Sequence, residues 1–120
     1  GAYDDYEPTW SSDCSWIAFQ SKRDENWDIY KMKADGTSIT RLTSNAADDS
    51  EPNWSPNGEW IAFQSKRNEI WQIYLIKPDG SSLTQLTSGE SEATDPSWFG
   101  NGAKIVMSYD DANDSKGEDI

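Results

Sequence analysis

The sequence of 120 residues contains no histidine and only one cysteine, Cys14. Without histidine, the chain cannot form a Ser-His-Asp triad or a histidine-ligated zinc or iron site. A single cysteine also excludes an internal disulfide and a cysteine metal cluster. The sequence lacks a Gly-x-Ser-x-Gly nucleophile elbow and a phosphate-binding loop. We therefore predict that the protein is not an enzyme, has no catalytic residues and requires no cofactor.

Basic residues are scarce: 10 lysines and arginines stand against 22 aspartates and glutamates, which gives a formal net charge of −12. Nucleic-acid binding needs a surplus of basic residues, so nucleic acid is excluded as a partner. No apolar run approaches the roughly 20 residues of a membrane-spanning helix, so no membrane insertion is expected. Hydrophobic residues make up only 34% of the chain, yet seven Trp, five Tyr and three Phe are present. Because disordered chains are poor in aromatic residues, we predict a folded domain with an aromatic core.

The chain repeats itself with a period of 44 residues. Residues 7–50 and 51–94 agree at 24 of 44 aligned positions, and both copies contain Trp-Ile-Ala-Phe-Gln-Ser-Lys-Arg. A third, incomplete copy begins with Asp-Pro-Ser-Trp at residue 95. We therefore divide the chain into repeat 1 with its lead-in (residues 1–50), repeat 2 (51–94) and an incomplete repeat 3 (95–120).

Each repeat is predicted to form four short strands, because β-branched and aromatic residues gather in short runs between Gly, Pro, Asp and Asn. The strands of repeat 1 are expected at Pro8–Ser11, Trp16–Ser21, Asp28–Lys33 and Ser38–Leu42. The run Trp-Ile-Ala-Phe is continuously apolar, which predicts a strand that is buried on both faces.

The turn between the first two strands differs between the repeats. Repeat 2 has Ser-Pro-Asn-Gly, which places Gly58 where a left-handed residue is expected. Repeat 1 has Cys14 at this position, and a left-handed cysteine costs about 1–2 kcal/mol relative to glycine. We therefore expect the turn at Cys14 to be either shifted or strained.

A period of about 40–45 residues with four strands per repeat is typical of a β-propeller blade. Five short motifs of repeat 2 resemble the blade repeat of TolB-type propellers, namely Pro-x-Trp-Ser-Pro-Asn-Gly (52–58), Ile-Ala-Phe-x-Ser-x-Arg (61–67), Ile-Tyr (73–74), Pro-Asp-Gly (78–80) and Leu-Thr (86–87). The resemblance covers nearly the whole chain. It implies an all-β fold, a partial β-propeller of about two and a half four-stranded antiparallel blades, in a periplasmic or extracellular location.

The resemblance leaves the function open, because similar blades occur in TolB proteins, in prolyl-oligopeptidase-like hydrolases and in other secreted proteins. We expect a non-enzymatic scaffold that binds a protein or peptide. The alternatives are an accessory propeller fragment of such a hydrolase and a module that binds Ca²⁺ or a small ligand.

Fewer than three blades would leave two aromatic blade faces exposed, whereas propellers typically have four to eight blades. Either the chain is part of a longer propeller or copies of it associate, and we expect a homo-oligomer, with a dimer as the first candidate. The residues predicted to pack between blades or between copies are Trp10, Trp16, Phe19, Trp54, Trp60, Phe63 and Trp98. Trp27 and Trp71 follow a charged loop and are candidates for surface aromatics.

Acidic residues precede the first strand of each repeat. The TolB resemblance would place five of them on an acidic rim beside the propeller channel: Asp5, Glu7, Asp49, Glu51 and Asp95. Such a rim suits Ca²⁺, which takes six to eight oxygen ligands, or a basic peptide. The structural alternative is that these acids cap turns and are solvated. The oxygen-rich tail, residues 110–119, is a further Ca²⁺ candidate, although its spacing differs from that of an EF-hand.

Four of the ten basic residues lie in the loop after the second strand of repeats 1 and 2: Lys22, Arg23, Lys66 and Arg67. They could anchor an anionic partner or form salt bridges with Asp24, Glu25 or Glu69. The negative field of the whole chain repels anions and favours the salt bridges.

Overall fold

The computed structural model describes residues 5–23, 25–44, 46–67, 69–88, 90–100 and 104–110. Repeat 1 forms an antiparallel four-stranded sheet, blade 1, in the order β1 (Asp5–Trp10), β2 (Trp16–Ser21), β3 (Asp28–Lys33) and β4 (Thr40–Arg41). Repeat 2 forms blade 2 in the same way, from β5 (Asp49–Trp54), β6 (Ile61–Ser65), β7 (Gln72–Ile76) and β8 (Thr84–Gln85). The described part of repeat 3 is a hairpin of β9 (Glu92–Phe99) and β10 (Lys104–Asp110). The prediction of an all-β, partial propeller is confirmed.

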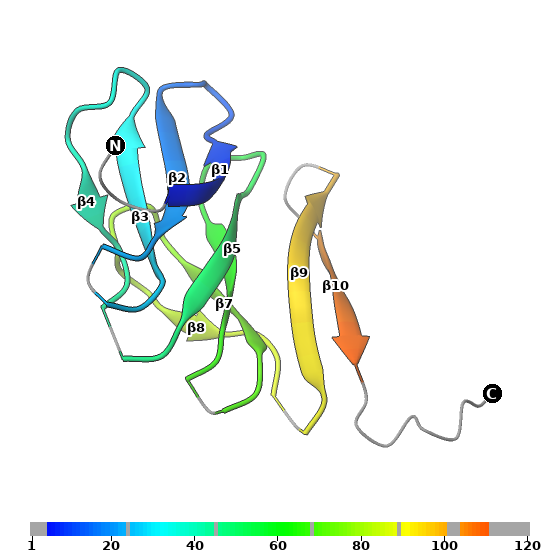
Figure 1. Cartoon of the computed structure of the whole chain (residues 1–120). Coiled ribbons are helices and arrows are strands. Elements are labelled where there is room, and N and C mark those ends of the chain that lie inside the picture. Colours follow the sequence, from blue (N-terminus) through cyan, green and yellow to red (C-terminus); the bar gives the residue numbers. More distant parts are fainter. Residues whose placement is uncertain are drawn as a thin grey trace.

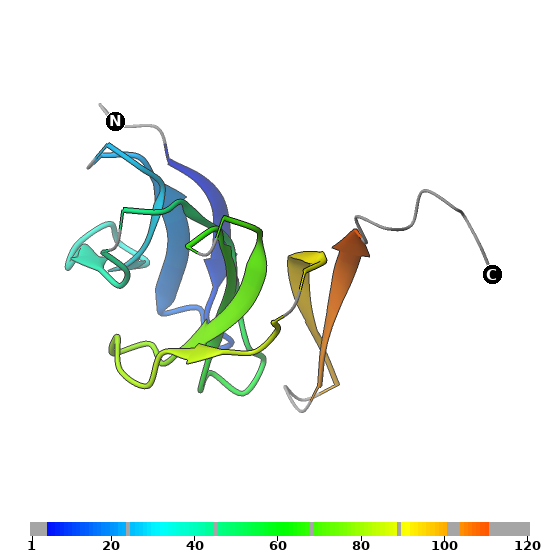
Figure 2. The ribbon, with the colours of Figure 1, turned by 90° about the horizontal axis from the view of Figure 1, so that it is seen from below.

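The three sheets follow one another in space as they do in sequence (Figures 1 and 2). Blade 2 lies between blade 1 and the β9–β10 hairpin, with β1 beside β5 and β5 beside β9. Each described sheet thus packs against the next sheet along the chain, as expected of stacked blades. Among the described residues there is no helix with the length and apolar character needed to cross a membrane.

Two of the four predicted strands of repeat 1 have the predicted bounds, namely Trp16–Ser21 and Asp28–Lys33. The first strand begins earlier than predicted, at Asp5. The fourth covers only Thr40–Arg41, both of which are exposed. Propensity located the central strands well because their apolar residues are buried, whereas the edge strand has little packing to extend it.

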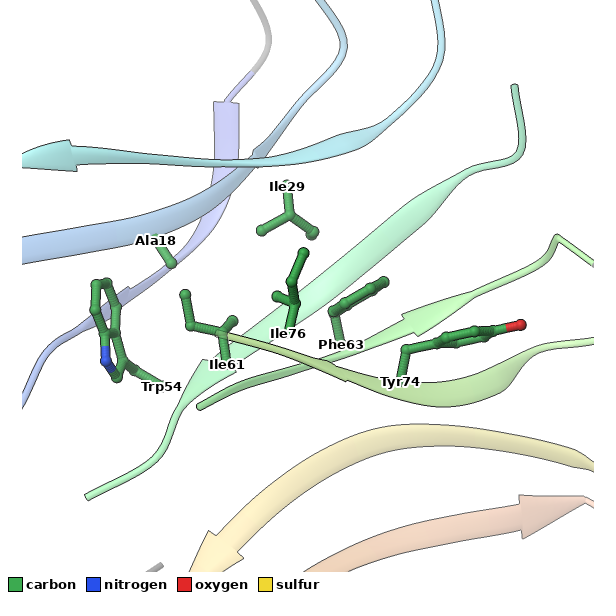
Figure 3. Close-up of a cluster of buried hydrophobic side chains, with 7 residues drawn as sticks. All are labelled: Ala18, Ile29, Trp54, Ile61, Phe63, Tyr74 and Ile76. Carbon is green, nitrogen blue, oxygen red and sulfur yellow. The ribbon is translucent and has the colours of Figure 1, made fainter. Parts of the chain in front are cut away.

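The main hydrophobic core lies between blades 1 and 2 (Figure 3). Ala18 and Ile29 of blade 1 face Ile61, Phe63 and Ile76 of blade 2. Trp54 and Tyr74 complete this cluster, and Trp16 and Leu42 pack against it. At about 25 cal/mol per Å² of buried apolar surface, the stacking of blade on blade is a main source of stability in this fold.

The turn at Cys14 keeps the geometry of the Gly58 turn and is therefore strained, not shifted. The φ angles are 63° at Cys14 and 78° at Gly58. Each N–H donates to the carbonyl oxygen three residues earlier, Ser11 or Ser55, at 2.9 Å. Asp13 fixes the turn by accepting hydrogen bonds from the Ser15 and Ser11 hydroxyls, which lower its pKa to about 2.

We expect Cys14→Gly to raise the free energy of unfolding by about 1 kcal/mol, because glycine adopts the left-handed conformation without steric cost. The matched control is Gly58→Ala, which should lower it by a similar amount. An added Cβ at Gly58 would meet only Ser12 Oγ at 3.8 Å, so the cost there is conformational. Urea unfolding followed by circular dichroism measures both changes. A Cys14→Gly variant with unchanged or lower stability would contradict the strain.

Candidate functional site

Each blade has two unlike faces. We call the face of blade 2 that packs on blade 1 its leading face, and it carries Trp54, Ile61 and Phe63. The opposite side of a blade is its trailing face, which in blade 1 carries Ala18 and Ile29. Repeats 1 and 2 have the same residues at these positions, so in both blades the leading face carries the larger side chains and the trailing face the smaller ones.

The three tryptophans at one repeat position differ sharply in burial. Trp54 is 7% exposed because blade 1 covers it, whereas Trp10, on the leading face of blade 1, is 51% exposed. Trp98 is half-buried against blade 2, where its Nε1 donates to the carbonyl oxygen of Asn53 at 2.9 Å. Trp54 and Trp98 thus pack between neighbouring sheets in the described chain, and Trp10 does not.

The rest of the leading face of blade 1 is less exposed than the sequence suggested. Ile17, Phe19 and Tyr30 are buried and form a second cluster with the half-buried Met32. The rings of Phe19 and Tyr30 stack at 5.8 Å, and the Arg23 guanidinium lies 4.9 Å from the centre of the Tyr30 ring. The face that was predicted to be exposed is therefore partly covered, because a charged side chain of the same blade lies over part of it. Trp10 is the large exposed aromatic on this face.

The remaining predicted tryptophans are half-buried and each lies near a lysine. Lys31 Nζ is 4.5 Å from the Trp16 ring, and Lys77 Nζ is 5.5 Å from the Trp60 ring. Both tryptophans are partly exposed, which suits cation–π contacts near the surface.

Trp27 and Trp71 also have a structural role through their main chain. The Trp27 N–H donates to Asp48 Oδ1 at 3.0 Å, and the Trp71 N–H donates to Glu92 Oε1 at 2.8 Å. Asp48, just before β5, and Glu92, the first residue of β9, therefore satisfy backbone donors of the preceding blade.

Three of the predicted rim acids share an unexpected backbone conformation. Glu7, Glu51 and Asp95 have φ angles of 56°, 55° and 54°, in the left-handed region that disfavours non-glycine residues. Each lies in a first strand (β1, β5 or β9) where the pairing register shifts. In the two junctions between sheets, this bulge presents an N–H to the preceding sheet, where Gln20 Oε1 accepts from Glu51 and Gln64 Oε1 accepts from Asp95, both at 2.8 Å.

The sequence analysis missed these glutamines. The available signal was a glutamine in both repeats within the otherwise apolar strand Trp-Ile-Ala-Phe-Gln-Ser. A buried side-chain amide needs a partner, and the bulged backbone of the next blade supplies it.

The three acids also influence one another electrostatically. Burial raises the pKa of Glu51, and the negative charges of Glu7 and Asp95 raise it further. The described residues contain no group of three or more cysteine or acidic side chains arranged to hold a metal ion. Of Asp5 only the backbone is described, and the oxygen-rich segment 111–119 lies outside the described residues.

Asp49, the other predicted rim acid, is in fact buried between the blades. Its Oδ2 accepts a hydrogen bond from Arg67 Nη2 at 3.0 Å, and its carboxylate has no exposed surface. The rim prediction for Asp49 is therefore wrong. The predicted salt bridges of Arg67 with the loop acids are wrong as well, because Arg67 turns back onto Asp49 and over the Tyr74 ring, 4.6 Å away.

Asp49 is part of a charged cluster in the junction between blades 1 and 2. Asp28 is also fully buried and pairs with Arg41. Thr43 lies between the two carboxylates and donates its hydroxyl toward Asp28 Oδ1 at 3.4 Å. Burial raises the pKa of Asp28 and of Asp49, and the charge of Asp49 adds to the rise at Asp28. Arg41 and Arg67 offset these rises only in part.

The next junction has an uncharged version of this cluster. Gln72, Gln85 and Ala93 occupy the positions of Asp28, Arg41 and Asp49. There the Thr87 hydroxyl donates to Gln72 Oε1, and Gln85 Nε2 donates to the carbonyl oxygen of Thr87 at 2.7 Å. The repeat fold therefore tolerates either a paired set of charges or a neutral hydrogen-bonded set at this place.

The buried acids predict how stability depends on pH. Because the folded-state pKa values of Asp28 and Asp49 are raised, their contribution to stability is fully present below the ordinary carboxyl pKa of about 4. It is lost as the pH rises through the raised values. We expect the free energy of unfolding to fall between pH 4 and neutrality, measured by urea unfolding at each pH. Asp49→Asn should flatten this dependence, whereas Asp35→Asn, at an exposed acid whose pKa is lowered, should not. An unchanged slope in Asp49→Asn would contradict the assignment.

Comparisons with known proteins agree with this architecture. A family model for the TolB beta propeller domain matches residues 2–118. No match was found among curated protein sequences.

Among solved structures, a putative TolB from Agrobacterium tumefaciens is 34% identical, with a TM-score of 0.84 over 92% of this chain and 40% of that one. TolB from Acinetobacter baumannii is 24% identical, with a TM-score of 0.79 over 89% of this chain and 27% of that one. The tricorn protease shares the fold at 22% identity, with a TM-score of 0.55 over 72% of this chain and 8% of that one. The chain therefore spans less than half the length of each of these proteins. With two sheets and a hairpin stacked as blades, the chain belongs to the TolB β-propeller domain family.

Proposed function

We propose that this chain is a non-enzymatic propeller scaffold that acts by binding and that associates with itself through its outer blade faces. The observation that carries the proposal is the exposure of Trp10, at a repeat position where Trp54 is covered by the preceding blade. An exposed large aromatic side chain is the residue type most enriched in the energetic centre of protein interfaces.

The opposite end of the stack offers a second exposed apolar residue. Val106 on β10 is 51% exposed, whereas Ala62, at the same position in repeat 2, has no exposed surface. Leu86, which corresponds to the half-buried Leu42, is also exposed. Exposed apolar residues thus lie at both ends of the stack, as association through blade faces requires.

The proposal requires no cofactor, because shape and apolar burial supply the contact. The acidic arc of Glu7, Glu51 and Asp95 would favour a basic peptide over an acidic one as an additional partner. Membership of the TolB family supports a periplasmic or extracellular location for this role.

The test is the mass of the 120-residue chain in solution, measured by multi-angle light scattering over a range of concentrations. We expect a mass of two or more copies at high concentration, and a stronger association with added salt, which screens the repulsion between chains of charge −12. Trp10→Ser should weaken the association, and Ile39→Ser, which removes a similarly exposed apolar residue from the approach to β4, should not. A monomer at every concentration would exclude self-association, and equal effects of both variants would indicate only nonspecific hydrophobic contact.

A further inference from the structure

A pocket of about 340 Å³ lies between blades 1 and 2, at the end of the sheets that carries the turns at Cys14 and Gly58. Both blades line it: Ser12, Asp13 and Trp16 come from blade 1, and Trp54, Asn57 and Pro78 come from blade 2. This volume is near the lower end of the range for small-ligand pockets. Because both walls belong to the described chain, the pocket depends neither on self-association nor on a further blade.

Two polar side chains of the pocket each have an atom without a hydrogen-bond partner among the described residues. Asp13 and Asn57 occupy the same position of repeats 1 and 2. In each, Oδ1 is used within its own turn, where it accepts a hydrogen bond at 2.7 Å from the hydroxyl of Ser11 or Ser55. Asp13 Oδ2 and Asn57 Nδ2 make no such bond with the described part of the chain. The pocket therefore combines an acceptor from one blade with a donor from the next.

Trp16 supplies an aromatic wall of the pocket. It packs against the core between the two blades and remains partly exposed. A tryptophan ring has a flat apolar face, which can stack on the C–H face of a sugar ring while the sugar hydroxyls bond to polar neighbours. Small-ligand pockets typically have this composition, with apolar walls and a few polar groups that fix the orientation of the ligand.

The charges near the pocket favour an uncharged ligand. Lys31 Nζ and Lys33 Nζ lie 4.5 and 5.9 Å from the Trp16 ring, so they disfavour a further cation on it. Hydrogen bonds within its turn lower the pKa of Asp13 to about 2, so its carboxylate stays ionised and disfavours an anion. A hydroxyl group both donates and accepts, so the hydroxyls of a neutral ligand can pair with Asp13 Oδ2 and with Asn57 Nδ2.

We infer that this pocket binds a neutral sugar ring, stacked on Trp16 and hydrogen-bonded through its hydroxyls to Asp13 Oδ2 and Asn57 Nδ2. The inference goes beyond the proposed scaffold role, because it adds a small-ligand site that a single copy of the chain contains. A single sugar ring offers little area and few hydrogen bonds, so the Kd is expected in the millimolar range.

The experiment titrates the ¹⁵N-labelled 120-residue chain with glucose, galactose and N-acetylglucosamine. The indole N–H signals of its seven tryptophans are followed by NMR. The signal of Trp16 is identified by its disappearance in Trp16→Leu. It should shift saturably with at least one of the three sugars. The signal of Trp71 should not shift, because Trp71 lies next to Gln72, at the opposite end of blade 2 from the pocket.

Asp13→Asn tests the acceptor without disturbing the turn, because Asn57 occupies the same position of repeat 2. It replaces Oδ2 by an amide donor, and we expect the affinity for the sugar to fall by about tenfold, as for the loss of a hydrogen bond to a charged group. The matched control is Asp35→Asn. Asp35 accepts hydrogen bonds from the N–H and hydroxyl of Thr37 in a similar turn outside the pocket, so its replacement should leave the affinity unchanged.

Each outcome decides for or against the sugar site. A saturable shift at Trp16 that weakens in Asp13→Asn and persists in Asp35→Asn supports it. No shift with any of the three sugars overturns it, as do equal losses in both variants. A shift with methylguanidinium and none with the sugars also overturns it, because the pocket would then accept a basic side chain. None of these results depends on the mass of the chain in solution, so the sugar site and the proposed self-association can fail separately.

Discussion

Replacing Trp54 with alanine is expected to lower the free energy of unfolding by about 3–5 kcal/mol, the usual cost of truncating a buried tryptophan. Trp54 belongs to the cluster between blades 1 and 2 and is nearly fully covered. Its removal would leave a cavity beside Ala18 and Ile61, because the two sheets are held apart by their other side chains. The total free energy of unfolding of such a domain is roughly 5–15 kcal/mol. A loss of this size would therefore unfold much of the population at moderate temperature.

The chain provides a matched control for this prediction in Trp10→Ala. Trp10 has the same repeat position and lies in the same Glu-Pro-x-Trp-Ser motif, but no blade of the described chain covers it. We expect Trp10→Ala to change stability by no more than about 1 kcal/mol. Urea unfolding followed by circular dichroism, at a concentration low enough to avoid association, measures both variants. Similar losses at Trp10 and Trp54 would contradict the assignment of the core to the junction between blades.

The second large effect is expected from Arg67→Met. This change would leave the Asp49 carboxylate buried and without its guanidinium partner, which typically costs about 3–5 kcal/mol. The Ser65 and Thr43 hydroxyls, which also lower the pKa of Asp49, would be the remaining compensation, because Oδ1 makes no hydrogen bond with any of the described residues. Arg67 also covers the Tyr74 ring, so its methylene groups contribute packing that methionine partly retains.

Asp49→Ala is the designed rescue for Arg67→Met. Ala93 occupies the equivalent position at the start of β9 and is fully buried, so the fold accepts alanine there. The double variant should recover most of the stability lost in Arg67→Met, because no unpaired charge remains. Chemical unfolding of the two single variants and the double variant gives the coupling free energy between the residues. Additive effects of the two substitutions would contradict a direct ion pair.

Some site residues could be placed from the sequence and others could not. The TolB resemblance placed Asp49 with Glu51 on a rim, because both acids come just before the predicted first strand of repeat 2. The structure separates them. The left-handed residue at position 51 and the register shift after Ser50 interrupt the alternation of the strand, so Asp49 enters the interior while Glu51 remains half-buried near Glu7 and Asp95. The local sequence does not predict a bulge of this kind, because glutamate and aspartate, unlike glycine, do not indicate a left-handed conformation.

The period of 44 residues, the four strands of a blade and the left-handed turn residue at Gly58 follow from the sequence alone, because each depends on residues that are neighbours in the chain. Only the tertiary structure decided that Trp54 is core and Trp10 is surface, although both lie in the same Glu-Pro-x-Trp-Ser motif. It also decided that Arg67 neutralises Asp49 of the preceding strand, not an acid of its own loop. The physical reason is that burial and charge pairing depend on which sheet covers a face, and stacking brings together residues that are distant in sequence.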